Sequence, residues 1–222
     1  MLTSWPASAE ELVAQQLALA RERPALFRPG PQIAIGGCFV CFPRAKRGAG
    51  EAGDPAWAAA VLRDGTEAVV RAAAGAPYEA GLLALREGPA LERAIRELEG
   101  TADVMLVNAT GHDHPRRAGL ALHLGAMLDL PTVGVTHRAL VAHGQWPQDE
   151  AGASSPLLLE EERVGYWLCT RPGTRPLAVH AGWRTDPQTA LEIVLRASAG
   201  HRTPEPLRQA RHAARAARAA SF

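Results

Sequence analysis

The sequence predicts an α/β domain with one mixed central sheet that is flanked by helices. The first third of the chain contains a strand pair joined by a tight turn, and the remainder alternates helices with strands, an order typical of α/β and α+β domains. The stretches 103–108 and 132–136 are almost continuously apolar, as expected of strands that are buried on both faces. The chain has 222 residues, of which 47% are hydrophobic, and this is enough for one substantial core. No boundary divides it, so residues 1–222 are predicted to form a single domain.

The first elements follow from capping and turn signals. Ser8 and Glu11 have capping-box spacing, so a helix is expected to begin there and to end before Pro24. The next elements are a strand with two interior glycines, an exposed loop and a hairpin around Asp64-Gly65, expected at 31–42, 43–55, and 57–62 with 66–74.

Periodicity and helix-stop signals assign the rest of the chain. A helix at 89–100 has a buried stripe and a C-cap glycine at position 100; the stripe consists of Leu91, Ala94, Ile95 and Leu98. The elements expected after it are a helix at 117–130, a polar loop at 143–162, a hairpin of 164–170 with 175–181, a helix capped by Thr185 that runs to Ala199, and an arginine-rich terminal helix at about 204–220. The terminal helix carries arginines on one face, which is either a solvated face or a phosphate-binding stripe: Arg208, Arg211, Arg215 and Arg218.

Composition narrows the class of protein. The net charge of +1 provides no global field that would attract nucleic acid, so any such surface must be local. Cys38, Cys41 and Cys169 do not form a disulfide framework, and the first two point to opposite faces of a strand, so we interpret them as small buried hydrophobic residues. The sequence shows neither a signal peptide nor an apolar run of about 18 residues. We therefore expect a cytoplasmic protein that does not contact membranes.

Polar residues follow two of the buried strands. Asn108 ends the first strand and leads into TGHDHPRR, and a second strand ends in Thr136, His137 and Arg138. The carboxyl ends of parallel strands are where ligands bind in open α/β sheets, although a polar loop that caps a helix would have the same composition. Upstream, Tyr78 and Arg86 precede Glu87, which could be a metal ligand, a base or a partner of a helix dipole.

Three blocks of the sequence resemble the endonuclease V family: PYEAGLLALREGPAL, VNATGHDHPRRAGLALHLGAMLDLPTVGVTHRAL, and WRTDPQTALEIVL with the later GHRTPEPLRQA. The resemblance runs from about residue 5 to residue 215. It implies an RNase H-like fold and metal-dependent cleavage of DNA or RNA near deaminated purines such as inosine, the activity of a deoxyinosine-specific endonuclease.

The resemblance also implies roles for individual residues. Glu87 and His114 match the family's catalytic Glu and His, and Tyr78 matches its wedge tyrosine. Asn108 stands where the family has Asp, His137 where it has Lys, and Phe39 (or Gly37, in a shifted register) where it has the carboxylate of the first strand. The implied catalytic residues are Glu87, His114 and His137, the metal ligands are Glu87 and Asn108, and the nucleic-acid contacts are Tyr78, Arg86, Arg116, Arg117 and Arg138.

These replacements remove most of the negative charge that a Mg²⁺ or Mn²⁺ cofactor requires. Two other sets of ligands could replace the lost carboxylates. Asp113 could supply a carboxylate, or His112, His114 and His137 could hold Mn²⁺ or Zn²⁺ together with Glu87. We therefore predict a divergent, monomeric endonuclease V-like protein with impaired cleavage of DNA or RNA. The alternative is a catalytically inactive module on the same fold that binds nucleic acid or a modified base.

Overall fold

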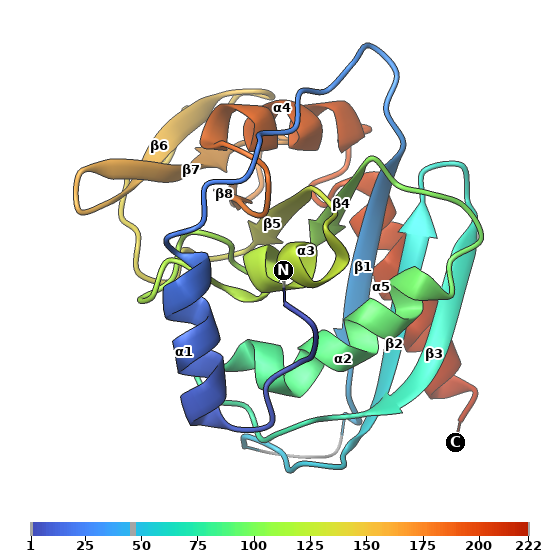
Figure 1. Cartoon of the computed structure of the whole chain (residues 1–222). Coiled ribbons are helices and arrows are strands. Elements are labelled where there is room, and N and C mark those ends of the chain that lie inside the picture. Colours follow the sequence, from blue (N-terminus) through green and yellow to red (C-terminus); the bar gives the residue numbers. More distant parts are fainter. Residues whose placement is uncertain (1, 45–47, 222) are drawn as a thin grey trace.

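An eight-stranded mixed sheet forms the centre of the molecule (Figure 1). The computed structural model describes residues 2–44 and 48–221. The strands lie in the order β3-β2-β1-β4-β5-β8-β7-β6, and their bounds are β1 (Ile35–Cys41), β2 (Pro55–Leu62), β3 (Glu67–Ala73), β4 (Val104–Val107), β5 (Thr132–Thr136), β6 (Ser154–Leu159), β7 (Glu162–Leu168) and β8 (Leu177–Ala181). The fold class predicted from the sequence is confirmed.

The three central strands β1, β4 and β5 are parallel, and all other pairs are antiparallel. The parallel strands are the apolar runs that the sequence identifies, and β4 is buried at every position. The predicted hairpins are present as β2–β3 and β7–β8. The parallel strands therefore end at one edge of the sheet, as the sequence predicts.

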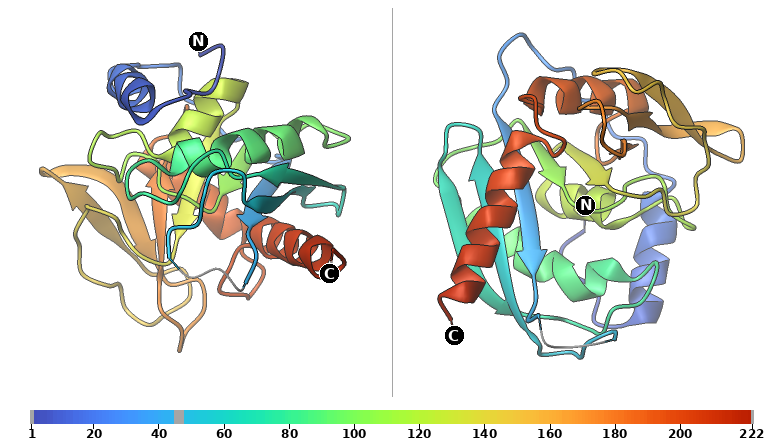
Figure 2. Two further views of the ribbon diagram at one scale, coloured as in Figure 1. Left: turned by 90° about the horizontal axis from the view of Figure 1, so that it is seen from below. Right: turned by 180° about the vertical axis from the view of Figure 1, so that it is seen from behind.

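Helices cover both faces of the sheet (Figure 2). The helices in the described part of the chain are α1 (Ala9–Leu19), α2 (Leu83–Arg96), α3 (Leu120–Leu128), α4 (Pro187–Ala197) and α5 (Glu205–Ala219). Cys38, Met105 and Leu91 belong to the core beneath α2 and α3, whereas Ile35, Leu106 and the inner side of α4 form the core of the opposite face. The helix α5 lies against β1 and β2 on that same opposite face. No helix in the described parts of the chain combines the length and the apolar character needed to cross a lipid bilayer.

The helix that contains Glu87 begins earlier than the sequence indicates. We expected it to start at Pro89, but α2 starts at Leu83, so Pro89 lies inside the helix. Proline cannot donate to the carbonyl four residues before it, and here Gly75 packs against the interrupted turn and donates its N–H to the Arg86 carbonyl at 3.2 Å. The expected cap at Gly100 is also wrong, because the helix ends at Arg96 with Glu97 as its C-cap. The predicted buried stripe is confirmed, with Ile95 only partly buried.

Three further expectations need correction. The helix α3 starts at Leu120 rather than at Arg117, because Arg117 has a left-handed φ of 57°. The predicted polar loop 143–162 contains the edge strand β6, whose Pro156 is tolerated at a sheet edge. Asp186, not Thr185, caps α4 by accepting the Thr189 N–H. The Thr185 hydroxyl instead donates to the Thr132 carbonyl. Within the predicted loop 43–55, residues 45–47 lie outside the described residues.

Candidate functional site

The ends of β1 and β4 place Phe39 beside Asn108. The parallel pairing runs as far as Cys38 opposite Val107, so Phe39 and Asn108 are the next residues on two adjacent strands. Alternation along β1 directs the Phe39 side chain to the face opposite Cys38, and Asn108 directly follows the end of β4. Phe39 packs on that face against α5. The sequence-based expectation that these positions are neighbours is consistent with this register.

The surroundings of Phe39 are cationic. The guanidinium carbon of Arg211 lies 5.3 Å from the centre of the Phe39 ring, and that of Arg215 lies 5.8 Å away. His137 follows β5, and its pKa is lowered by burial and by the positive charges of Arg202 and Arg211. His137 is therefore neutral at pH 7. A positive field at this edge favours an anion and opposes a metal ion.

Glu87 belongs to α2, on the opposite face of the sheet. Its side chain is partly buried, and burial raises its pKa to about 8 even though the nearby Arg86 lowers it. The pKa of Cys38 is raised by burial and then by Glu87, so Glu87 lies near the side of β1 from which Phe39 points away. At neutral pH most of the Glu87 carboxyl groups are protonated, which leaves little negative charge here.

These residues do not fit a Mg²⁺ ion. Mg²⁺ requires oxygen ligands that normally include one or two carboxylates. Within residues 2–44 and 48–221 there is no group of three or more His, Cys, Asp or Glu side chains that could hold a metal ion. The His-rich site for Mn²⁺ or Zn²⁺, which the sequence left open, is excluded for the described residues by the same observation.

His114 is fixed by hydrogen bonds to the backbone. Its Nδ1 accepts the Arg116 N–H at 3.1 Å, so its Nε2–H is free to donate to the Gly81 carbonyl, also at 3.1 Å. Burial and then Arg116 lower the pKa of His114 to about 4. The ring is therefore neutral, and neither nitrogen has a lone pair available for a metal ion or a substrate proton.

The Gly81 carbonyl is held by donors from three side chains. Gln16 Nε2, His114 Nε2 and Arg116 Nη2 lie 3.2, 3.1 and 2.7 Å from the Gly81 oxygen. Gly81 ends the short turn that carries Tyr78, whose side chain is 54% exposed. The role of Gln16 could not be inferred from the sequence, because nothing in the sequence pairs α1 with this turn. The three donors fix the turn and leave the Tyr78 ring accessible for stacking.

Arg86 was expected to contact nucleic acid, but its side chain is buried. Its guanidinium group lies 3.7 Å from the Asp54 carboxylate and 4.1 Å from the centre of the Phe42 ring, and it donates to the Ala76 carbonyl at 2.6 Å. A phosphate contact requires exposure, which Arg86 lacks. Arg86 instead anchors the segment that precedes Tyr78.

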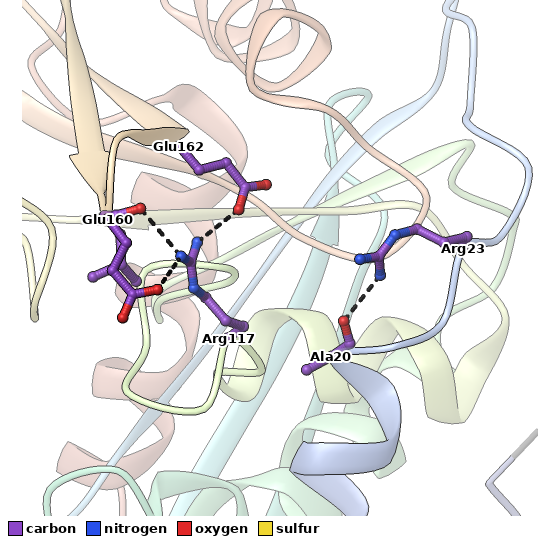
Figure 3. A network of polar contacts seen from close by, with 6 residues as sticks. Ala20, Arg23, Arg117, Glu160 and Glu162 are labelled. Carbon is purple, nitrogen blue, oxygen red and sulfur yellow. Dashed lines mark hydrogen bonds and ion pairs between the residues drawn. The ribbon is translucent and has the colours of Figure 1, made fainter.

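The charges of Arg116 and Arg117 are engaged within the protein. Arg116 donates to Gln16 and Gly81. Arg117 forms ion pairs with Glu160 at 3.0 Å and Glu162 at 3.1 Å, which Figure 3 shows together with the contact of Arg23 to the Ala20 carbonyl. Arg138 differs from both, because it is exposed and forms no ion pair with any described residue. Of the five predicted nucleic-acid contacts, only Tyr78 and Arg138 present free side chains.

Asp113 cannot serve as a substitute metal ligand. Its carboxylate is completely buried and accepts the backbone N–H groups of Leu140, Val141 and Ala142 at 2.7, 2.9 and 2.7 Å. The fully buried His180 approaches it, with 3.5 Å between Nδ1 and Oδ2. Asp113 therefore stabilises the loop that follows β5. His180 was missed in the sequence because it lies in an ordinary apolar strand pattern.

Sequence and structure comparisons with known proteins all identify endonuclease V. The family model described as Endonuclease V matches residues 31–212. The endonuclease V of Alkalilimnicola ehrlichii is 42% identical over 145 residues, which span 65% of this chain and 64% of that protein, slightly less than two thirds of its length. The crystal structure of the endonuclease V of Streptomyces avermitilis superimposes with a TM-score of 0.85 at 33% identity, over 99% of this chain and 97% of that chain. The endonuclease V of Ciona intestinalis, in complex with a DNA that contains an inosine, shares the fold with a TM-score of 0.78 at 20% identity, over 96% of this chain and 98% of that chain.

Proposed function

This chain belongs to the endonuclease V family, and from that premise we propose that it binds nucleic acid containing deaminated bases such as inosine, with Mg²⁺-dependent cleavage impaired. One observation above all supports the impairment of metal-dependent cleavage. At the ends of the parallel strands, Phe39 lies beneath two guanidinium groups and next to the uncharged Asn108. Nucleases of this family are generally metal-dependent, and a metal ion acts by clamping the attacking and leaving oxygens. A site without carboxylates has little affinity for such an ion.

The retained features favour binding. Tyr78 is exposed on a turn that three side-chain donors fix. An aromatic ring held in this way can stack on a base, an interaction that contributes about 1–3 kcal/mol per base. Arg138 and His137 are exposed at the end of β5, where they can reach a phosphate group. We keep the monomeric state and the cytoplasmic location as predictions.

A second candidate function is slow metal-dependent cleavage, and Glu87 favours it. The Glu87 carboxyl group accepts no hydrogen bond and forms no ion pair within the part of the chain that the structure describes. A partly buried acid without such a partner is a candidate for an ion or a substrate proton. If a divalent ion binds to this protein, Glu87 is the residue that we expect to hold it.

A cleavage assay combined with a binding assay separates the two functions. Single- and double-stranded DNA and RNA, each with and without one inosine, are incubated with Mg²⁺ or Mn²⁺, and affinity is measured in parallel over a range of salt concentrations. We expect salt-sensitive binding that prefers inosine, with little or no nicking. Efficient Mg²⁺-dependent nicking that Glu87→Ala abolishes would establish the second function.

The role of Tyr78 is tested with a matched aromatic control. Tyr78→Ala should reduce the preference for inosine, whereas Trp146→Ala removes a similarly exposed ring (55% exposed) that is remote in sequence from the turn. Equal losses in both variants would indicate nonspecific stacking. Absence of binding to every one of these nucleic acids would refute the proposed function.

A further inference from the structure

Arginines from two segments gather beside Phe39. Arg211 and Arg215 of α5 lie over its ring, and Arg202, from the segment before α5, lowers the pKa of Arg211 by its positive charge. We refer to Arg202, Arg211 and Arg215 as the arginine cluster. Arg202 is held in place because its Nε–H donates to the Arg175 carbonyl at 2.7 Å.

No acid among the described residues neutralises the arginine cluster. None of its three members forms an ion pair with a described residue, whereas Arg208, one turn earlier on the same helix, is paired with Glu205 at 2.6 Å. The Nε atom of Arg211 is buried and has no hydrogen-bond partner in the described chain. Burial lowers the pKa of Arg211, and the charged groups that lower it further, Arg215 and Arg202, are cations.

Such an arrangement is unfavourable for the isolated protein. The half-buried Arg211 loses part of its hydration without an ion pair in return, and the like charges of the cluster repel each other. An anion placed among the three side chains would relieve both effects. The guanidinium fork matches the oxygens of a phosphate group in two-point hydrogen bonds, and the Phe39 ring supports the guanidinium groups from below.

The position of the arginine cluster indicates which anion it binds. It adjoins the ends of β1, β4 and β5, where His137 and Arg138 are exposed. In metal-dependent nucleases a divalent ion provides the positive charge that meets the phosphodiester. Here positive charge is already present as fixed guanidinium groups, and the residues do not fit the ion.

We propose that the arginine cluster binds a phosphate group of the nucleic acid directly, without a bridging divalent ion. This inference rests on the proposed function, because it assigns the phosphate contact of the same site. A free nucleotide or inorganic phosphate carries the same chemistry, so the experiment includes both a nucleic acid and inorganic phosphate.

The test measures binding in EDTA. A labelled inosine-containing duplex is titrated with the wild-type protein and with Arg211→Ala, Arg211→Gln and Arg208→Ala. Arg208→Ala is the matched control, because it removes one positive charge from the same helix at an exposed, ion-paired position. In parallel, inorganic phosphate is added to each protein and the melting temperature is recorded.

We expect wild-type binding to persist in EDTA and not to strengthen when Mg²⁺ is added. Either substitution of Arg211 should weaken binding at least about tenfold, as the loss of a charge-assisted hydrogen bond would. It should also reduce the slope of log affinity against log salt concentration by about one, which corresponds to one released counterion. Arg208→Ala should stay within about twofold of wild type, since exposed ion pairs contribute little. Phosphate should raise the melting temperature of wild type but not that of the Arg211 variants.

Different failures are distinguishable. If the duplex binds in EDTA but Arg211 and Arg208 variants lose affinity equally, the direct phosphate site is wrong and the proposed function stands. If binding requires Mg²⁺, the inference is likewise overturned. If no nucleic acid binds, the proposed function fails; phosphate stabilisation that depends on Arg211 would then still establish an anion site, for a free phosphate compound. Arg211→Gln keeps most of the side-chain length, so a folding defect of Arg211→Ala does not prevent the test.

Discussion

Replacement of Glu87 by Gln should stabilise the protein at alkaline pH. Burial raises the pKa of Glu87 from 4.5 to about 8, so the folded state binds a proton that the unfolded state has released between these two pH values. By linkage, stability that is fully present below about pH 4.5 is lost as the pH rises towards 8. Glutamine is uncharged at every pH and avoids this loss.

The size of the effect follows from the pKa. One pKa unit corresponds to about 1.4 kcal/mol, so the shift of Glu87 sets an upper limit of about 5 kcal/mol. Glu87 is partly exposed, and solvent screening reduces the effect. We therefore expect Glu87→Gln to gain about 1–3 kcal/mol over wild type at pH 8.5 and almost nothing at pH 4.5.

Urea denaturation at several pH values between 4.5 and 9 measures this difference. The histidines whose pKa is lowered by burial, such as His114, change stability in both proteins and cancel in the comparison. Glu97→Gln is the control, because Glu97 is the C-cap of the same helix and its side chain is 50% exposed. It should leave the pH dependence of wild type unchanged.

Parallel pH profiles of wild type and Glu87→Gln would refute this reasoning. A second refutation is specific to metal binding. If Mg²⁺ removed the pH-dependent loss in wild type, an ion would have to bind to ionised Glu87. The conclusion that these residues do not fit Mg²⁺ would then be wrong.

Three further predictions concern the neighbouring residues. Asp113→Asn should cost about 3–5 kcal/mol in urea denaturation, because an amide cannot accept three backbone N–H groups with both of its ends; a loss below 1 kcal/mol would show that the carboxylate is dispensable. His114→Ala should cost about 1–3 kcal/mol by removing a donor to the Gly81 carbonyl, and hydrogen exchange should increase in the turn; unchanged exchange would contradict the positioning role. Phe39→Asp with Asn108→Asp should gain Mg²⁺ affinity by calorimetry only when Arg211→Gln is also present, since the new carboxylate would otherwise pair with the guanidinium group; a gain in the double variant alone would contradict this.

Most of the fold could be predicted from the sequence, because its signals are local. The apolar runs of β4 and β5 and the turn around Asp64-Gly65 depend on residues that are adjacent in the chain. The start of α2 could not be predicted, because a proline normally marks a helix end and nothing in the local sequence shows that Gly75 packs against this turn and donates to the Arg86 carbonyl. Edge strand β6 was missed because pairing on one side only places few demands on its sequence.

The resemblance predicts the positions of the candidate site, but the burial and hydrogen bonding of its side chains could not be predicted from the sequence. Resemblance identified Phe39, Asn108 and Glu87, and the register of β1 and β4 is consistent with the first two as neighbours. The burial of Arg86 and the fixed hydrogen bonds of His114 could not be predicted, because both depend on partners that are distant in the sequence. The sequence shows that a residue is basic. It does not show whether the charged group is already bound by an acid or a carbonyl within the protein, as that of Arg86 is.

The raised pKa of Glu87 and the unpaired guanidinium groups both disfavour a bound dication. A dication bound at the strand ends would lower the pKa of a nearby carboxyl group and would repel guanidinium groups. The pKa of Glu87 is about 8 because its carboxyl group is withdrawn from solvent, and the guanidinium group of Arg211 lies above Phe39. On the two faces of β1 the features act in the same direction, because a protonated Glu87 offers no charge to a cation and the guanidinium groups beside Phe39 repel one. A phosphate group can bind directly to such a site. Its fixed guanidinium groups cannot clamp the leaving oxygen during cleavage as a divalent ion would.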